Sequence, residues 1–83
     1  MKEFWKERAS AEVTIIVEIG HQEIDYVYDV ILLNNQDGNT VIEEITCCKY
    51  WINANELLSE QCSGPHSNEQ IMDLIDFNTL RWE

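Results

Sequence analysis

The sequence predicts an α+β fold: an antiparallel sheet of three strands, or of four if the C-terminal segment joins it, with two short helices packed on one face. Three observations favour this fold. Apolar and polar residues alternate through much of the first half of the chain, as they do in half-buried strands. The pair Asp37-Gly38 lies between two apolar runs, which is typical of a tight hairpin turn. After residue 52, two segments carry the capping residues that begin helices.

The composition is that of one small globular domain covering residues 1–83. Of the 83 residues, 45% are hydrophobic, and there are only three Gly and one Pro. This length leaves no room for a second core. The charge is unusual, because 16 Asp and Glu face five Lys and Arg, for a formal net charge of −11. Such a surface repels nucleic acids and anionic membranes, and it attracts cationic partners.

The environment of the chain also follows from its composition. No apolar run approaches the ~18–20 residues that a membrane-spanning helix needs. The first ten residues, MKEFWKERAS, lack the apolar run of a signal peptide. Three cysteines is an odd number, so we expect free thiols in a reducing compartment, with a cytoplasmic location.

Three segments are predicted strands. Residues 11–19 (AEVTIIVEI) and 24–33 (IDYVYDVILL) alternate in polarity and are separated by a tight turn in the sequence GHQE. Residues 40–51 (TVIEEITCCKYW) follow the Asp37-Gly38 pair, which predicts a type I′ turn. These three strands form an antiparallel meander.

Two segments after the third strand are predicted helices. Asn53 followed by Glu56 forms a capping box, which predicts a helix over residues 53–62. Ser67 followed by Gln70 predicts a second helix start. The apolar residues of that second helix recur at helical spacing: Ile71, Leu74 and Ile75.

The two ends of the chain each fit two structures. Residues 2–8 (KEFWKER) fit either a helical turn or an extension of the first strand. Residues 79–83 (TLRWE) fit either a short last strand or a docked tail. The number of strands in the sheet therefore stays at three or four.

The turns also predict the register of the sheet. A two-residue loop at Asp37-Gly38 sets Tyr28 opposite Cys47. A two-residue turn at His21-Gln22 sets Ile15 opposite Tyr28. The two inferences place the same residues on one face, which we expect to be the core under the helices. That face carries Val13, Ile15, Val17, Ile19, Ile24, Tyr26, Tyr28, Val30, Leu32, Ile45, Cys47 and Trp51.

The opposite sheet face is predicted to combine five carboxylates with exposed apolar groups. Carboxylates two positions apart on a strand are ~6.6 Å apart, a charge density comparable to that of a nucleic-acid backbone. In this register Glu18 faces Asp25, and like charges directly opposite each other destabilise a sheet. A destabilising feature with no local gain indicates a face shaped for a partner. The predicted partner-binding residues are Glu12, Ile16, Glu18, Asp25, Val27, Asp29, Ile31, Glu44 and Tyr50.

These features predict a non-catalytic inhibitor that blocks the nucleic-acid-binding surface of a basic partner protein by mimicking nucleic acid. In size and charge alone, the chain is similar to small acidic phage inhibitors of host defence or nucleic-acid enzymes, and to immunity proteins of nuclease toxins. An immunity-type inhibitor is therefore one alternative. A homodimer or larger homo-oligomer that covers the apolar band is another. Acidity that serves solubility alone is a third.

The sequence offers no sign of an enzyme or of a cofactor. It contains no P-loop, no G-x-G-x-x-G, no H-E-x-x-H and no nucleophile elbow around a serine. A domain of this size also has little depth for a substrate pocket of ~300 Å³ or more. We therefore expect no catalytic residues and no bound cofactor.

All three cysteines and one histidine lie within residues 45–66, which raises the question of a metal site. Alternation places Cys47 in the core and Cys48 on the other face, and neighbouring strand residues cannot share an ion without a bulge. The spacing Cys62-x3-His66 resembles a ligand pair, but the second pair of a zinc site is missing. We therefore favour small core thiols over the alternative, a zinc-binding module built from Cys48, Cys62 and His66.

Overall fold

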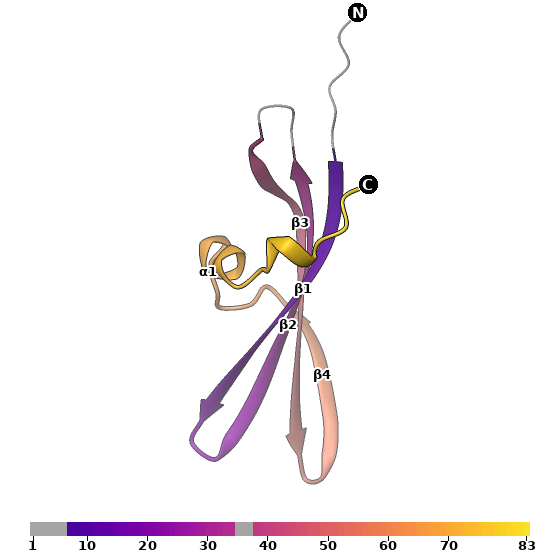
Figure 1. The fold of residues 1–83 in the computed structure, drawn as a ribbon. Helices are drawn as coiled ribbons and strands as arrows, with labels where there is room; N and C mark the ends of the chain where they lie inside the picture. The colour runs from indigo at the N-terminus through magenta and orange to yellow at the C-terminus, as the bar shows by residue number, and fades with distance from the viewer. Residues whose placement is uncertain (1–6, 35–37) are drawn as a thin grey trace, which may run out of the picture.

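The computed structural model describes residues 7–34 and 38–83. Within them, four antiparallel strands form one meander in the order β1-β2-β3-β4 (Figure 1). The molecule is elongated, with extents of 60 × 20 × 18 Å. The strands are β1 (Glu7–Ile19), β2 (Gln22–Asn34), β3 (Thr40–Asn53) and β4 (Glu56–Cys62), and they are followed by the short helix α1 (Asn68–Asp73) and the 3-10 turn η1 (Phe77–Thr79).

The predicted α+β fold with two helices on the sheet is wrong, because the segment predicted as the first helix is the strand β4. The structure is a β-rich fold with one helix and one 3-10 turn in the described residues. Ala54 and Asn55 have φ angles of 51° and 66°, as the two central residues of a type I′ hairpin turn require. Leu58 and Cys62 are four residues apart, a spacing that fits one face of a helix and one face of a strand equally well.

The predicted register between the second and third strands is confirmed around Tyr28, which lies opposite Cys47. Closer to the β2–β3 turn, a β-bulge shifts the register and places Ile42 opposite Leu32. Ile42 thereby packs against the core. The predicted turn at Asp37-Gly38 lies outside the described residues except for Gly38, whose φ of +83° suits a tight turn.

The register between β1 and β2 differs from the prediction by two residues. The connecting loop is Gly20-His21 rather than His21-Gln22, so that Val13 instead of Ile15 lies opposite Tyr28. Gly20 has a φ of +64°, and glycine favours this conformation at the first central position of a type II′ turn. Because side chains alternate with a period of two, a shift of two residues leaves every side chain on its predicted face.

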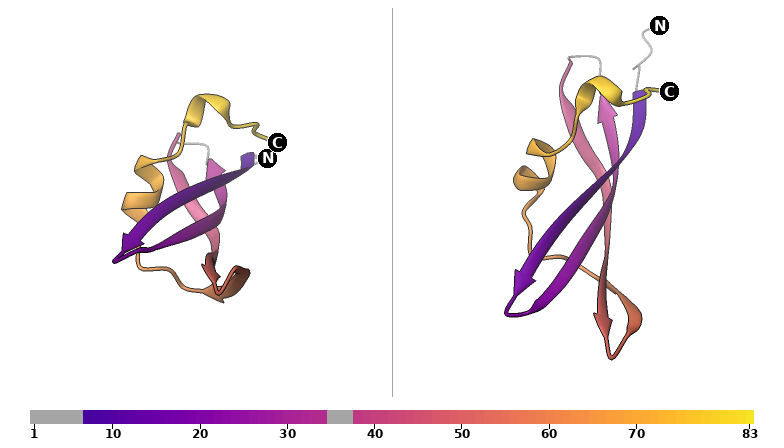
Figure 2. Two further views of the ribbon diagram at one scale, coloured as in Figure 1. Left: turned by 90° about the horizontal axis from the view of Figure 1, so that it is seen from below. Right: turned by 60° about the horizontal axis from the view of Figure 1, so that its bottom comes forward.

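The core lies between one face of the sheet and the C-terminal part of the chain. Figure 2 shows α1 and η1 on the same side of the sheet. Most of the predicted core face packs in a hydrophobic cluster there, but Val17, Ile24 and Trp51 lie nearer the hairpin tips and are only half-buried. Ile19 is 60% exposed, because it lies at the hairpin tip beyond the part of the sheet that α1 covers. The buried residues of the cluster are Val13, Tyr28, Val30, Leu32, Cys47, Ile71 and Ile75.

Two segments flank this core: the start of α1 and the C-terminal tail. Ser67 and Gln70 form the predicted capping box, with the Gln70 N–H donating to Ser67 Oγ at 3.2 Å. The C-terminal segment is a docked tail and not a strand. Its last residue, Glu83, exchanges two backbone hydrogen bonds of 2.9 and 3.0 Å with Arg8, and Leu80 and Trp82 pack against the core.

Gly64 connects β4 to α1, and we expect its replacement to destabilise the fold strongly. Gly64 has a φ of +78°, and a Cβ atom there would overlap the Tyr28 ring. Gly64→Ala therefore combines left-handed backbone strain with overpacking, and should lower the free energy of unfolding by about 2–5 kcal/mol. Gly20→Ala is the matched control, because its φ is +64° with open space around it. It should lose only about 1–2 kcal/mol. Equal losses for the two variants in urea unfolding would contradict the proposed overlap with Tyr28.

Candidate functional site

The sheet face opposite α1 gathers the residues predicted to bind a partner. We call this surface the acidic face. Alternation along the strands places all nine predicted partner-binding residues on it, and it adds Glu23, which the sequence analysis missed. The acidic face consists of Glu12, Ile16, Glu18, Glu23, Asp25, Val27, Asp29, Ile31, Glu44 and Tyr50.

Like charges meet directly across the first two strands of the acidic face. Glu12 of β1 lies opposite Asp29 of β2. Glu18 lies opposite Glu23, so the prediction that Glu18 faces Asp25 is wrong. The difference comes from the two-residue shift in register, which places Asp25 opposite Ile16 of β1 instead of Glu18. Each of the two like-charge pairs destabilises the isolated sheet.

Apolar side chains lie among these carboxylates. Ile16 and Tyr50 flank Asp25 on the neighbouring strands, and Ile16 is 59% exposed. Val27 and Ile31 are half-buried on the same face. A hydrogen bond with Cys48 raises the pKa of Tyr50, with smaller contributions from the surrounding negative charges, so the phenol is neutral and able to donate a hydrogen bond at pH 7.

The described cations are Arg8, Lys49 and Arg81 of the C-terminal tail, and their ion pairs involve Glu43 and Glu60, which lie outside the acidic face. Arg8 lies at the start of β1 and contacts the Glu43 carboxylate at 2.9 Å. Lys49 belongs to the covered side of the sheet, where it lies 3.4 Å from Glu60 and 5.2 Å from the centre of the Trp51 ring. The central carboxylates of the acidic face therefore have no ion-pair partner among the described residues.

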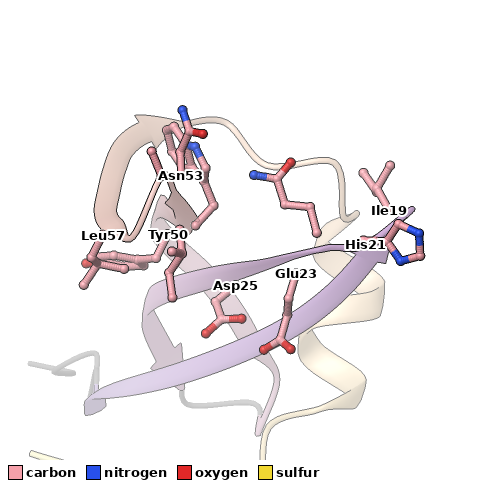
Figure 3. A pocket seen from close by; sticks show the side chains of 11 residues that line it. Ile19, His21, Glu23, Asp25, Tyr50, Asn53 and Leu57 are labelled. Atoms are coloured by element: carbon pink, nitrogen blue, oxygen red, sulfur yellow. The ribbon is translucent and has the colours of Figure 1, made fainter.

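The acidic face ends in a cleft between two hairpin tips. Figure 1 shows the β1–β2 hairpin and the β3–β4 hairpin diverging below the level of α1. The space between them has a volume of about 810 Å³. In Figure 3, the carboxylates of Glu23 and Asp25 lie between Tyr50 and Leu57 on one side and the Ile19–His21 tip on the other. The lining residues are Ile19, His21, Gln22, Glu23, Asp25, Tyr50, Trp51, Ile52, Asn53, Ala54 and Leu57.

Exposed apolar side chains form part of the cleft. Ile52 is 64% exposed and Leu57 is 69% exposed, both from the β3–β4 hairpin. The cleft could not be expected from the sequence while residues 53–62 were predicted as a helix, because that helix removes one wall. Alternation offered a partial signal, because Ile52 continues the outward series that contains Tyr50. The cleft can therefore provide desolvated contact area next to two carboxylates.

A second cluster of reactive side chain types lies on the covered face. The Tyr28 hydroxyl is 2.6 Å from His66 Nδ1, and the His66 backbone N–H donates to the same hydroxyl at 3.4 Å. Cys47 and Cys62 lie opposite each other on β3 and β4, with their Sγ atoms 3.6 Å apart. His66 also contacts the Tyr26 ring edge-on, at a centroid distance of 5.5 Å.

Burial controls the chemistry of this second cluster. It raises the pKa of Tyr28 to about 12, although the hydrogen bond from the His66 backbone opposes the shift. Burial also raises the pKa of Cys47 to about 11, assisted by a hydrogen bond with Cys62. Both groups are therefore protonated at pH 7. A protonated buried thiol is a weak nucleophile, so this geometry does not resemble an activated catalytic cysteine.

The three alternative metal ligands are not brought together. Cys48 lies on the acidic face, opposite Val27, whereas Cys62 and His66 lie on the covered side of the sheet. Among residues 7–34 and 38–83, no group of three or more His, Cys, Asp or Glu side chains is arranged to hold a metal ion.

Comparisons with known proteins identify no relative of this chain. No protein-family model matches it, and no curated protein or solved structure is significantly similar to it. In the part of the chain that the structure describes, no helix is long and apolar enough to cross a membrane.

The Tyr28 cluster makes stability dependent on alkaline pH. The pKa of Tyr28 rises from 10.0 to about 12 on folding, so its contribution is present in full below pH 10 and is lost as the pH rises towards 12. Cys47 acts in the same direction from pH 9 to about 11. We expect the free energy of unfolding to fall above pH 9, by up to about 1.4 kcal/mol per pH unit for each group.

Urea unfolding from pH 8 to about 12 measures this effect, because the folded and unfolded forms differ in bound protons between about pH 9 and 12. Tyr28→Phe should flatten the decline above pH 10. Tyr26→Phe is the control, because it leaves the hydrogen bond between Tyr28 and His66 in place. The same pH profile for wild type and Tyr28→Phe would show that the phenol is not responsible.

Proposed function

We propose that the acidic face binds a basic surface of a partner protein and thereby blocks the binding of nucleic acid to that surface. One observation carries this proposal. The two like-charge pairs, Glu12 with Asp29 and Glu18 with Glu23, lie on an exposed face that also presents apolar side chains. This combination weakens the isolated fold, and it suits a face that is completed by a cationic partner.

The two like-charge pairs have an energetic cost that a partner could compensate. A like-charge pair directly across two strands costs roughly 0.2–1 kcal/mol relative to neutral residues. Alternating signs would avoid this cost, as ordinary protein surfaces do. No described cation lies among these four carboxylates, so the compensation within the fold is small. Lys and Arg side chains of a partner would provide it, and they would also accelerate association through long-range attraction.

The spacing of the charges supports a nucleic-acid-binding partner. The two like-charge pairs are six residues apart along β1, which corresponds to ~20 Å of strand. A face of this length with negative charge at both ends is comparable to the stretch of phosphate backbone that a small basic domain contacts. Glu44 continues the negative charge onto β3, where it lies opposite Ile31.

The cleft gives the proposed interface a centre. Interface energy is concentrated in a few well-packed residues, and Arg is enriched among them. An arginine side chain that enters between the hairpin tips would meet the carboxylates of Glu23 and Asp25. Its apolar stem, or an apolar neighbour, would pack on Ile52 and Leu57, which are exposed in the free protein.

A homo-oligomer is a second candidate, favoured by the exposure of Ile16, Ile52 and Leu57. Apolar groups that gather on one face are often covered by a second copy of the same chain. In this case the molecular mass in solution would increase with concentration, and polar substitutions in the cleft would lower that mass.

Neutralising one member of a like-charge pair should stabilise the free protein. Glu18→Gln and Asp29→Asn should each raise the free energy of unfolding by about 0.2–1 kcal/mol at low salt, because each removes one repulsion across the strands. Glu60→Gln is the control, because it removes the same charge but also a contact with Lys49. It should not stabilise the fold. A loss of stability in Glu18→Gln or Asp29→Asn, measured by urea unfolding, would remove the main support for the proposal.

Affinity capture from a lysate of the source cell, or of its host if the source is a virus, tests the function itself. Wild-type protein should retain a basic nucleic-acid-binding protein at low salt and release it in a stepwise salt gradient. The double variant Glu18→Lys, Asp25→Lys should retain at least about tenfold less. The purified partner should then lose nucleic-acid binding when wild-type protein is added.

The matched control for the capture is the double variant Glu7→Lys, Asp73→Lys. It changes the net charge by the same amount, and both residues are exposed outside the acidic face. It should retain the partner nearly as well as wild type does. Equal loss in the two double variants would show that net charge alone matters. Recovery of only the chain itself would favour the homo-oligomer.

A further inference from the structure

Cys47 and Cys62 have the geometry of two halves of a disulfide. They lie directly opposite each other on the antiparallel strands β3 and β4, and their Sγ atoms are 3.6 Å apart. Directly opposite residues in antiparallel strands have Cα atoms about 4.5–5.5 Å apart, which is inside the range of about 4.4–6.8 Å found for disulfides. A bond of about 2.05 Å requires the sulfur atoms to approach by about 1.6 Å, and side-chain rotation can provide much of this.

We propose that Cys47 and Cys62 form a disulfide site that a low-molecular-weight disulfide, such as oxidised glutathione, oxidises. The proposal does not depend on the function of the acidic face, because the two thiols lie on the covered side of the sheet. It distinguishes this pair from Cys48, which lies on the acidic face next to Cys47 in the sequence. The three thiols of the chain therefore have different roles in oxidation.

The reaction proceeds by two thiol–disulfide exchanges. First, the Cys62 thiolate attacks one sulfur atom of oxidised glutathione, forming a mixed disulfide and releasing one glutathione thiolate. The Cys47 thiol then loses its proton and attacks the Cys62 sulfur, which displaces the second glutathione as a thiolate. In sum, two protein thiols are oxidised to one disulfide, and one glutathione disulfide is reduced to two thiols that take up the two protons.

Burial sets the order of the two steps. Cys62 is half-buried at the end of β4, so a small disulfide can reach its sulfur. Cys47 is 4% exposed, and its sulfur is accessible to Cys62 rather than to a dissolved oxidant. Cys48 cannot replace Cys47, because it lies opposite Gln61 and its side chain points to the other face of the sheet.

The disulfide would join β3 to β4 at the base of the hairpin that they form. This hairpin carries Ile52 and Leu57, which form one wall of the cleft. Cys62 is also the last residue of β4, just before the segment that connects to α1. The disulfide would therefore restrict the unfolded chain and hold the cleft wall to the core at the same time.

Peptide mapping after oxidation tests the proposal. The protein is incubated with oxidised glutathione, free thiols are blocked by alkylation, and the denatured chain is digested with trypsin. Cleavage after Arg8, Lys49 and Arg81 gives peptides 9–49 and 50–81, so that a disulfide between β3 and β4 links two separate peptides. We expect this link in monomeric wild-type protein. The oxidised protein should have a thermal unfolding midpoint about 5–15 °C higher than the reduced protein.

Variants that each lack one of the three thiols identify the partners. In Cys48→Ser, Cys47 is the only thiol left in peptide 9–49, and the link should form as in wild type. In Cys62→Ser the link should be absent. A link that disappears in Cys48→Ser, an accumulation of mixed disulfide at Cys62 without a link, or an oxidised monomer less stable than the reduced one would each overturn the proposal. Because Cys48→Ser leaves the buried pair intact, the test does not depend on how well a Cys47 variant folds.

Discussion

Tyr28 determines how the C-terminal part of the chain lies on the sheet. Its side chain is 1% exposed, its hydroxyl contacts His66 Nδ1 at 2.6 Å, and its ring fills the space beside Gly64. Gly64 and His66 come just before α1, so these contacts fix where the helix begins. Ile71 of α1 and Ile75, two residues after its end, then complete the core on the face that carries Tyr28. A short helix has little stability of its own, and it depends on this attachment.

As a consequence, no element among residues 7–34 and 38–83 covers the other sheet face. A chain of 83 residues has one short helix and one tail available in its described part, and both pack on the same side of the sheet. The hairpin tips extend beyond that cover, which is why Ile19, Ile52 and Leu57 are exposed although their strands are regular. A long antiparallel sheet with a small cover therefore creates both the acidic face and the cleft. The proposed binding surface is a direct result of the fold rather than an addition to it.

The structure could be predicted from the sequence where the alternation of side chains determines it. It could not be predicted where pairing between distant strands determines it. The register that places Tyr28 opposite Cys47 was predicted correctly, but nearer the turn the pairing differs by one residue from the one that a two-residue loop sets, with Asn34 opposite Thr40, and the β-bulge makes up the difference. Each residue of the first hairpin lies on its predicted face despite the two-residue error in register. The pairing of Glu23 with Glu18 was missed. The strand β4 was predicted as a helix because Leu58 and Cys62 fit both periods, and pairing with β3 overrode the local capping signal. The cleft could not be predicted without that strand.

The charge of the acidic face also discriminates between the two ways of covering it. In a symmetric homodimer the same patch faces itself, so the carboxylates of one copy would approach those of the other. Burying Glu18 and Glu23 against their own equivalents would add repulsion and desolvation to the repulsion that already exists within the sheet. A basic partner replaces the repulsion between copies with attraction, and this attraction offsets the cost of desolvation. Salt separates the two cases, because screening strengthens an association between like charges and weakens one between opposite charges. The apolar residues alone fit either partner, and the carboxylates favour the basic one.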